Sequence, residues 1–148
     1  MDTIENRILR TTKTIKFPVN LVWMVWSNPE FIAKWWGPQG FTNTIQSMDF
    51  KEGGEWKFTM HGPDGKNYPN RSIYKEIIHL QKIVFEHFNP HFIATIIFEP
   101  KGDETFIDWS LLFDSVEMYE IVTTVHKAEE GQRENFHRLE EYLGGCRE

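Results

Sequence analysis

The 148-residue sequence predicts an α+β fold, in which a curved antiparallel sheet of six to seven strands wraps around a long C-terminal helix. Two patterns point to this fold. Between residues 41 and 114, short alternating apolar runs are separated by turn residues, which is typical of an antiparallel meander. After Phe113, apolar residues recur at helical spacing. This helix is the only long amphipathic element expected, so it should cover the apolar face of the sheet.

The N-terminal part predicts a strand followed by two short helices. Residues 7–16 are rich in β-branched and charged residues, which favours an edge strand. Pro18 begins the first helix, whose apolar residues continue to Trp26. Asn28 and Pro29 provide the N-cap and first-turn proline of a second helix, which runs from about residue 30 to 36 and ends at Gly37-Pro38.

The remaining elements are six strands and the long helix. Short turn segments separate the strands, so strands adjacent in sequence should be adjacent in the sheet. The helix carries one apolar stripe and should end at Gly144-Gly145. We expect the strands near residues 41–50, 54–61, 68–79, 82–88, 91–100 and 104–114, and the stripe at Ile121, Val125, Ala128, Gln132, Phe136, Leu139 and Leu143.

Length and composition narrow the class of protein. The chain fits a single domain, expected over residues 1–148. With 16 Lys and Arg against 22 Asp and Glu, its formal charge is −6, which opposes binding to nucleic acid or to anionic membrane surfaces. There is no membrane-spanning apolar stretch or secretory signal, and the single cysteine, Cys146, cannot form an internal disulfide. We therefore expect a cytoplasmic protein.

Aromatic residues are the unusual feature of the composition. The chain has 12 Phe, 6 Trp and 4 Tyr, which make up 15% of its residues. Rings of this size either fill a core or line a cavity. The ring content alone leaves this choice open. A strongly twisted sheet around one helix leaves space at its open end, which the two short helices would close, and this arrangement predicts an apolar pocket between the sheet and the C-terminal helix.

Four motifs stand out in the sequence: Trp35-Trp36-Gly37-Pro38, Gly53-Gly54-Glu55-Trp56-Lys57-Phe58, Met60-His61-Gly62-Pro63-Asp64-Gly65 and Tyr74-Lys75-Glu76-Ile77. Together with the predicted order of elements, they resemble the START-like (SRPBCC, helix-grip) superfamily. More narrowly, the chain is similar to the group named for the C-terminal domain of the activator of heat-shock-protein-90 ATPase, which borders the polyketide-cyclase-like proteins. The resemblance implies a deep cavity, which in various relatives holds lipids, polyketides, hormones or other apolar molecules, but it implies no single chemistry.

Strand alternation and the resemblance together select the candidate pocket residues. Residues two apart on a strand share a face, so Trp56 and Phe58 should point inward together. Trp35 and Trp36 form either a lid or a plug, and at most one of them can face the cavity because adjacent helical residues point about 100° apart. The candidates are Trp35, Trp36, Trp56, Phe58, Met60, Tyr74, Glu76, Phe85, His87, Trp109, Phe113 and Phe136.

Three functions stay open at this level. The first is the binding of a small apolar or aromatic ligand. The second is a cyclase, dehydratase or hydrolase acting on a polyketide-like substrate, with Glu76, His87 or Tyr74 moving a proton. The third is a chaperone-linked protein-interaction domain, which predicts an exposed apolar patch. We expect no metal and no cofactor, because no ligand set or phosphate-binding loop is visible, and hydrophobic sheet edges allow a homodimer.

Overall fold

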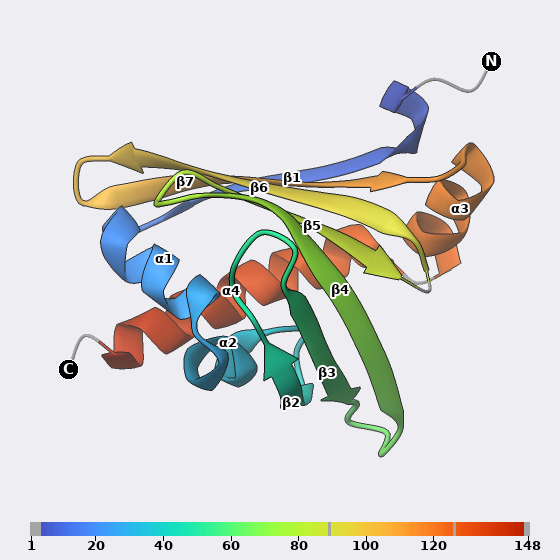
Figure 1. Ribbon diagram of the computed structural model, residues 1–148, viewed down its shortest axis with the longest axis horizontal. Helices are drawn as coiled ribbons and strands as arrows, with labels where there is room; N and C mark the ends of the chain where they lie inside the picture. Colours follow the sequence, from blue (N-terminus) through green and yellow to red (C-terminus); the bar gives the residue numbers. More distant parts are fainter. Residues whose placement is uncertain (1–3, 89, 126, 147–148) are drawn as a thin grey trace.

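A computed structural model describes residues 4–88, 90–125 and 127–146, and within them shows a seven-stranded sheet that curves over a long helix (Figure 1). This confirms the predicted α+β fold. The elements are η1 (Ile4–Arg7), β1 (Ile8–Ile15), α1 (Val19–Ser27), α2 (Pro29–Trp35), β2 (Thr42–Met48), β3 (Glu55–His61), β4 (Asn67–Ile78), β5 (Lys82–Phe88), β6 (Phe92–Lys101), β7 (Glu104–Phe113), α3 (Val116–Glu120), the π-helix η2 (Ile121–Val125) and α4 (Ala128–Cys146).

The strand order explains how the sheet closes over the helix. From β2 to β7 each strand pairs antiparallel with the next, as short turns require, and β1 pairs with β7 at the far edge. The sheet order is therefore β1-β7-β6-β5-β4-β3-β2. The edge position expected for the first strand is confirmed, and its charged residues protect that edge from further pairing.

Helices α1 and α2 lie under one end of the sheet (Figure 1), and aromatic side chains fill the core there. Trp26 on α1 packs edge-on against Trp35, Phe98 and Trp109, with ring centroids 4.9, 5.6 and 5.6 Å away. Edge-on packing is favourable because it places the positive edge of one ring against the negative face of another. The Nε1 atom of Trp35 donates to the carbonyl of Val25 at 3.1 Å, so this ring is fixed inside the core.

The C-terminal helical region differs from the predicted single stripe. Instead of one helix from residue 121, the chain forms α3, η2 and then α4. Lys127, just before α4, has φ 52°, a left-handed conformation that an α-helix does not contain. The predicted stop at Gly144-Gly145 is wrong, because α4 continues to Cys146. A glycine near a helix end costs only about 1 kcal/mol, which the packing of α4 on the sheet offsets.

A bulge in β4 corrects one prediction about strand faces. Pairing between β4 and β5 shifts register between Tyr74 and Glu76, so the simple alternation does not continue through this point. Tyr74 is buried, whereas the side chain of Glu76 is 43% exposed and its carboxylate lies 2.7 Å from the Nζ atom of Lys82. Glu76 therefore faces a cation near the surface instead of pointing into the interior.

Candidate ligand pocket

An apolar cavity of about 290 Å³ lies between the concave face of the sheet and the start of α4. It is lined by residues of β3 to β7, of the segment after α2, and of η2 and α4. Among the described residues, no Asp, Glu, Lys or Arg lines it. Its apolar walls consist of Trp36, Pro38, Trp56, Phe58, Met60, Phe85, Phe92, Trp109, Leu111, Phe113, Val122 and Ala128.

Antiparallel register places one row of cavity residues across five strands. Each of the five residues is directly opposite the next in the pairing of β3 with β4, β4 with β5, β5 with β6, and β6 with β7. Directly opposed residues share a face of the sheet, so the row points as one toward α4. The row is Trp56, Ser72, His87, Phe92 and Phe113.

Only one of the two adjacent tryptophans after α1 reaches the cavity. Trp35 is 1% exposed and belongs to the core, whereas Trp36 lines the cavity. The Trp36 ring centroid lies 5.1 Å from that of Trp56 and 5.4 Å from that of Trp109. Three indoles therefore meet at the cavity, with Trp36 in contact with the other two.

Two side chains of α4 hold the segment that carries Trp36. The Nη1 atom of Arg138 donates to the carbonyls of Trp36, Gly37 and Pro38, each at 2.9 Å. Asn135 donates to the Trp35 carbonyl at 2.9 Å and accepts from the Gly37 N–H at 3.1 Å. These contacts fix one wall of the cavity. The Gly37-Pro38 pair was visible in the sequence, but nothing in the sequence pointed to its partners on α4.

Gly37 is required at this wall for two reasons. Its φ of 97° lies in the region that only glycine adopts without strain. In addition, a Cβ atom at this position would lie 2.7 Å from the Cε atom of Met60. The left-handed φ is the stronger of the two reasons, because the flexible methyl end of Met60 could move aside for a Cβ atom.

Four polar atoms of the cavity residues have no hydrogen-bond partner within the described structure. They are buried, and an unmet buried donor or acceptor costs about 1–3 kcal/mol. The Oε1 atom of Gln132 accepts from the hydroxyl of Thr11 at 2.5 Å, which leaves its Nε2 atom without a partner. The four atoms are Ser72 Oγ, Trp56 Nε1, Trp109 Nε1 and Gln132 Nε2.

Sequence reasoning missed two of these four residues as cavity residues. Ser72 is small and polar, so the sequence gives no reason to select it. Gln132 lies on the predicted apolar stripe of the helix, and this position is the feature of the sequence that could have identified it as a cavity residue. Both are now seen in the cavity wall, at 0% and 6% exposure.

His87 is the only titratable candidate for proton transfer that lines the cavity, among the described residues. Its Nδ1 atom lies 2.8 Å from the carbonyl oxygen of Pro90, and its Nε2 atom lies 2.7 Å from Oδ1 of Asn70. Burial lowers the pKa of His87, so the ring is neutral at pH 7 and can donate to only one of these oxygens at a time. The ring stacks on Phe92 with centroids 4.5 Å apart.

The other predicted site residues outside the cavity lining lie in the core, in a neighbouring groove or near the surface. Tyr74 stacks beside Trp56 in the core, and burial raises the pKa of its hydroxyl, which therefore stays protonated. Phe136 packs edge-on against Trp109 with centroids 5.5 Å apart and lines a neighbouring polar groove between β1 and α4. Glu76 is paired with Lys82. The three groups considered for proton transfer, Glu76, His87 and Tyr74, therefore do not converge.

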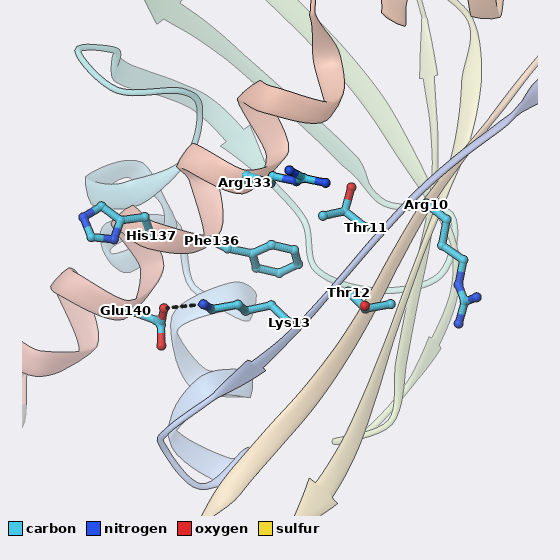
Figure 2. A pocket seen from close by; sticks show the side chains of 8 residues that line it. All are labelled: Arg10, Thr11, Thr12, Lys13, Arg133, Phe136, His137 and Glu140. Atoms are coloured by element: carbon cyan, nitrogen blue, oxygen red, sulfur yellow. Dashed lines mark ion pairs between the residues drawn. The ribbon is translucent and has the colours of Figure 1, made fainter.

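A second hollow, a polar groove of about 460 Å³, lies between β1 and α4 (Figure 2). Figure 2 shows Thr11 and Lys13 directed toward α4, whereas Arg10 and Thr12 point to the other side of the strand. The Nζ atom of Lys13 lies 3.6 Å from a carboxylate oxygen of Glu140. Thr11 and Phe136 form part of its wall toward the apolar cavity, since their respective contacts, Gln132 and Trp109, line that cavity.

The described residues lack two kinds of feature. They contain no group of three or more His, Cys, Asp or Glu side chains that could hold a metal ion. None of the described helices has the length and apolar character needed to span a membrane.

Comparison with known proteins identifies the family. The profile of the family described as "Activator of Hsp90 ATPase homolog 1-like protein" matches residues 16–144, which is most of the chain. The chain belongs to this family. The START-like resemblance is confirmed with it. A search among the curated proteins gives no match to this AHSA1-like protein.

Solved structures support the same fold for this AHSA1-like protein. A protein from Arthrobacter aurescens is 23% identical, with a TM-score of 0.89 over 97% of this chain and 89% of that one. Protein NE0264 from Nitrosomonas europaea is 22% identical, with a TM-score of 0.87 over 96% and 97%. An AHSA1-like protein from Aeromonas hydrophila is 15% identical, with a TM-score of 0.76 over 93% and 94%. At these identities the likeness concerns the fold alone.

Proposed function

We propose that this AHSA1-like protein binds a small apolar or aromatic molecule in the cavity between its sheet and α4, as a carrier or sensor. The observation that carries the proposal is a cavity of about 290 Å³ whose walls are aromatic and aliphatic and include no charged side chain among the described residues. Ligand sites in proteins are typically of this kind, apolar with a few placed polar groups. Exclusion of water from the three indoles provides the driving force.

The two other functions have less support. An enzyme acting on a polyketide-like substrate needs converging acid and base groups, whereas His87 alone among the three candidates lines the cavity. An interaction domain needs a continuous apolar patch. The exposed large hydrophobic residues of the described chain are Tyr68, Ile78, Ile97 and Ile121, and only Ile78 and Ile97 line a common hollow.

The test compares a variant that fills the cavity with a matched neighbour that does not. Ala128 lines the cavity at the start of α4, so Ala128→Phe should reduce the affinity for an apolar fluorescent probe at least about tenfold. Glu129 is exposed and outside the lining, so Glu129→Phe should leave the affinity within about twofold.

Native mass spectrometry of the protein purified from its own cells provides an independent reading. A small molecule retained by the wild type and absent from the Ala128→Phe variant would support the cavity as its site. Failure of the wild type to retain or take up any apolar molecule would refute the proposal.

A further inference from the structure

The cavity wall contains hydrogen-bonding groups that the protein itself does not use. Trp56, Ser72, Trp109 and Gln132 each have one buried polar atom without a partner among the described residues. All four residues line the same cavity. Native proteins rarely leave buried polar groups unpaired, so a cluster of them in one wall needs an explanation.

All four of these atoms can donate a hydrogen bond. An indole Nε1–H and an amide Nε2–H can only donate, and a hydroxyl can donate as well. The orientation of Gln132 is set by the Thr11 hydroxyl, which donates to its Oε1 atom and leaves the Nε2 atom as the unpartnered end. The complementary partner for all four groups is therefore an acceptor, such as a carbonyl or ether oxygen.

The lack of charged side chains among the described lining residues restricts the ligand further. With no Lys or Arg among the described lining residues, a carboxylate or phosphate in the cavity would lose its hydration without gaining a counter-ion. An ammonium group would find no carboxylate and would face N–H groups that repel it. A neutral ligand avoids both costs.

The unpartnered groups come from two sides of the cavity. Trp56 and Ser72 are directly opposed on β3 and β4. Trp109 on β7 is opposed to Thr11 on β1, and Thr11 holds Gln132 of α4. The ring of Trp36 lies against both Trp56 and Trp109. A ligand whose apolar ring lay against these indoles would have its oxygen next to the residues that carry the donors of one side.

We infer that the ligand is a neutral cyclic molecule with at least one oxygen acceptor, such as a ring ketone, held by the N–H and O–H groups of Trp56 and Ser72 or of Trp109 and Gln132. This inference rests on the proposed binding function and names its ligand class.

A matched set of two-ring probes tests the inference by calorimetry or ligand-observed NMR. The probes are tetralin, tetralone, aminotetralin and tetralin carboxylate, which share a skeleton and differ in one substituent. We expect tetralone to bind about tenfold more tightly than tetralin, because its carbonyl meets an unpaired donor. The two charged probes should bind more weakly than tetralin.

Paired variants locate the donors. One of the double variants, Trp56→Phe with Ser72→Ala or Trp109→Phe with Gln132→Leu, should lower the tetralone-to-tetralin affinity ratio to about one. Trp26→Phe with Ser47→Ala is the matched control, because it removes the unpartnered buried atoms of Trp26 and Ser47, which do not line the cavity. This control should keep the ratio of the wild type.

The outcomes separate the inference from the function on which it rests. Equal binding of tetralone and tetralin by the wild type, or tightest binding of a charged probe, overturns the ligand class and leaves the binding function intact. Binding of none of the four probes overturns the ligand class, and it overturns the binding function as well if native mass spectrometry also finds no retained apolar molecule. The wild-type series decides these points even if a double variant does not fold.

Discussion

The apolar cavity and the polar groove lie on two sides of one wall, and they differ in how their polar groups are satisfied. The groove is larger, about 460 Å³ against about 290 Å³. Each Lys and Arg that lines it lies within 4.0 Å of a carboxylate, whereas the cavity residues leave four polar atoms without a partner. The pairs of the groove are Arg10 with Asp108, Lys13 with Glu140, and Arg133 with Glu129.

The difference shows that size alone does not indicate where a ligand binds. Charged groups that are already paired and largely exposed offer a ligand little, because it would have to replace an ion pair or compete with water. A ligand that pairs with a buried, unpartnered donor gains a hydrogen bond without breaking an existing one. The smaller hollow is therefore the better candidate site.

A new charge should have the largest effect in the cavity and a much smaller one on β1, the strand that borders the groove. Ser72 is 0% exposed, so Ser72→Asp buries a carboxylate without a cation and should lower the free energy of unfolding by about 3–5 kcal/mol at pH 7. Thr12 on β1, the strand that borders the groove, is exposed, points away from α4 and lies directly opposite Asp108, so Thr12→Asp should cost about 1 kcal/mol through like-charge repulsion.

Urea unfolding measures both variants. Burial raises the pKa of a carboxyl group, so the Ser72→Asp penalty should also shrink as the pH falls and the group becomes neutral. Equal penalties for the two variants would mean that the cavity is as well solvated as the exposed face of β1.

The two arginines of α4 give the next largest contrast. Arg138 donates to four carbonyls of the Trp36 segment at 2.9 Å, so Arg138→Ala should cost about 2–4 kcal/mol and loosen the packing of Trp36. Arg133 makes an exposed i,i+4 pair with Glu129, so Arg133→Ala should cost about 0.5 kcal/mol or less. Urea unfolding gives both costs, and the change in tryptophan fluorescence on adding Trp36→Phe isolates Trp36 among the six tryptophans. An Arg138→Ala variant as stable as Arg133→Ala would contradict the anchoring role.

The smallest expected effect concerns two histidines near the turn between β5 and β6. His91 lies 2.7 Å from Glu86 and 2.6 Å from Asp114, and its hydrogen bond to Glu86 is the main cause that raises its pKa above 6.5. Burial lowers the pKa of His87 below 6.5. An NMR titration should therefore show His91 losing its proton at higher pH than His87. The reverse order would contradict the assigned environments.

The raised pKa of His91 also predicts how stability depends on pH. A group whose folded-state pKa is raised contributes stability that is fully present below its unfolded pKa, near 6.5, and is lost as the pH rises through the folded value. His91→Gln should cost about 1 kcal/mol or less at pH 6 and almost nothing at pH 9, because the pair is partly exposed. Unfolding free energies at the two pH values measure this difference.

Most of the fold could be predicted because it depends on local patterns. Period-two alternation placed Trp56 and Phe58 on the buried face, and the turn residues separated strands that pair as neighbours. The bulge after Tyr74 could not be predicted, because no residue type there signals an extra position in the strand. The same is true of the helix break at Lys127, whose conformation is left-handed without glycine or asparagine.

The site was less predictable because it depends on contacts between distant segments. Alternation could place His87 inward, yet it could not show that Arg138 binds the backbone around Gly37. Nor could it show that Thr11 orients Gln132, since 121 positions separate them. A sequence reveals which residues are apolar, but whether a buried polar atom has a partner is a property of the folded chain.

The pairing of β1 with β7 has a consequence for the order of folding. Strands β2 to β7 can assemble as successive hairpins, whereas Arg10 and Asp108, which join β1 to β7, are 98 positions apart. Closing so long a loop costs more entropy than closing a hairpin, and β1 leaves the ribosome long before β7. We therefore expect β1 to wait unpaired during synthesis, protected from aggregation by its lysine, arginine and threonine side chains, and to complete the sheet last.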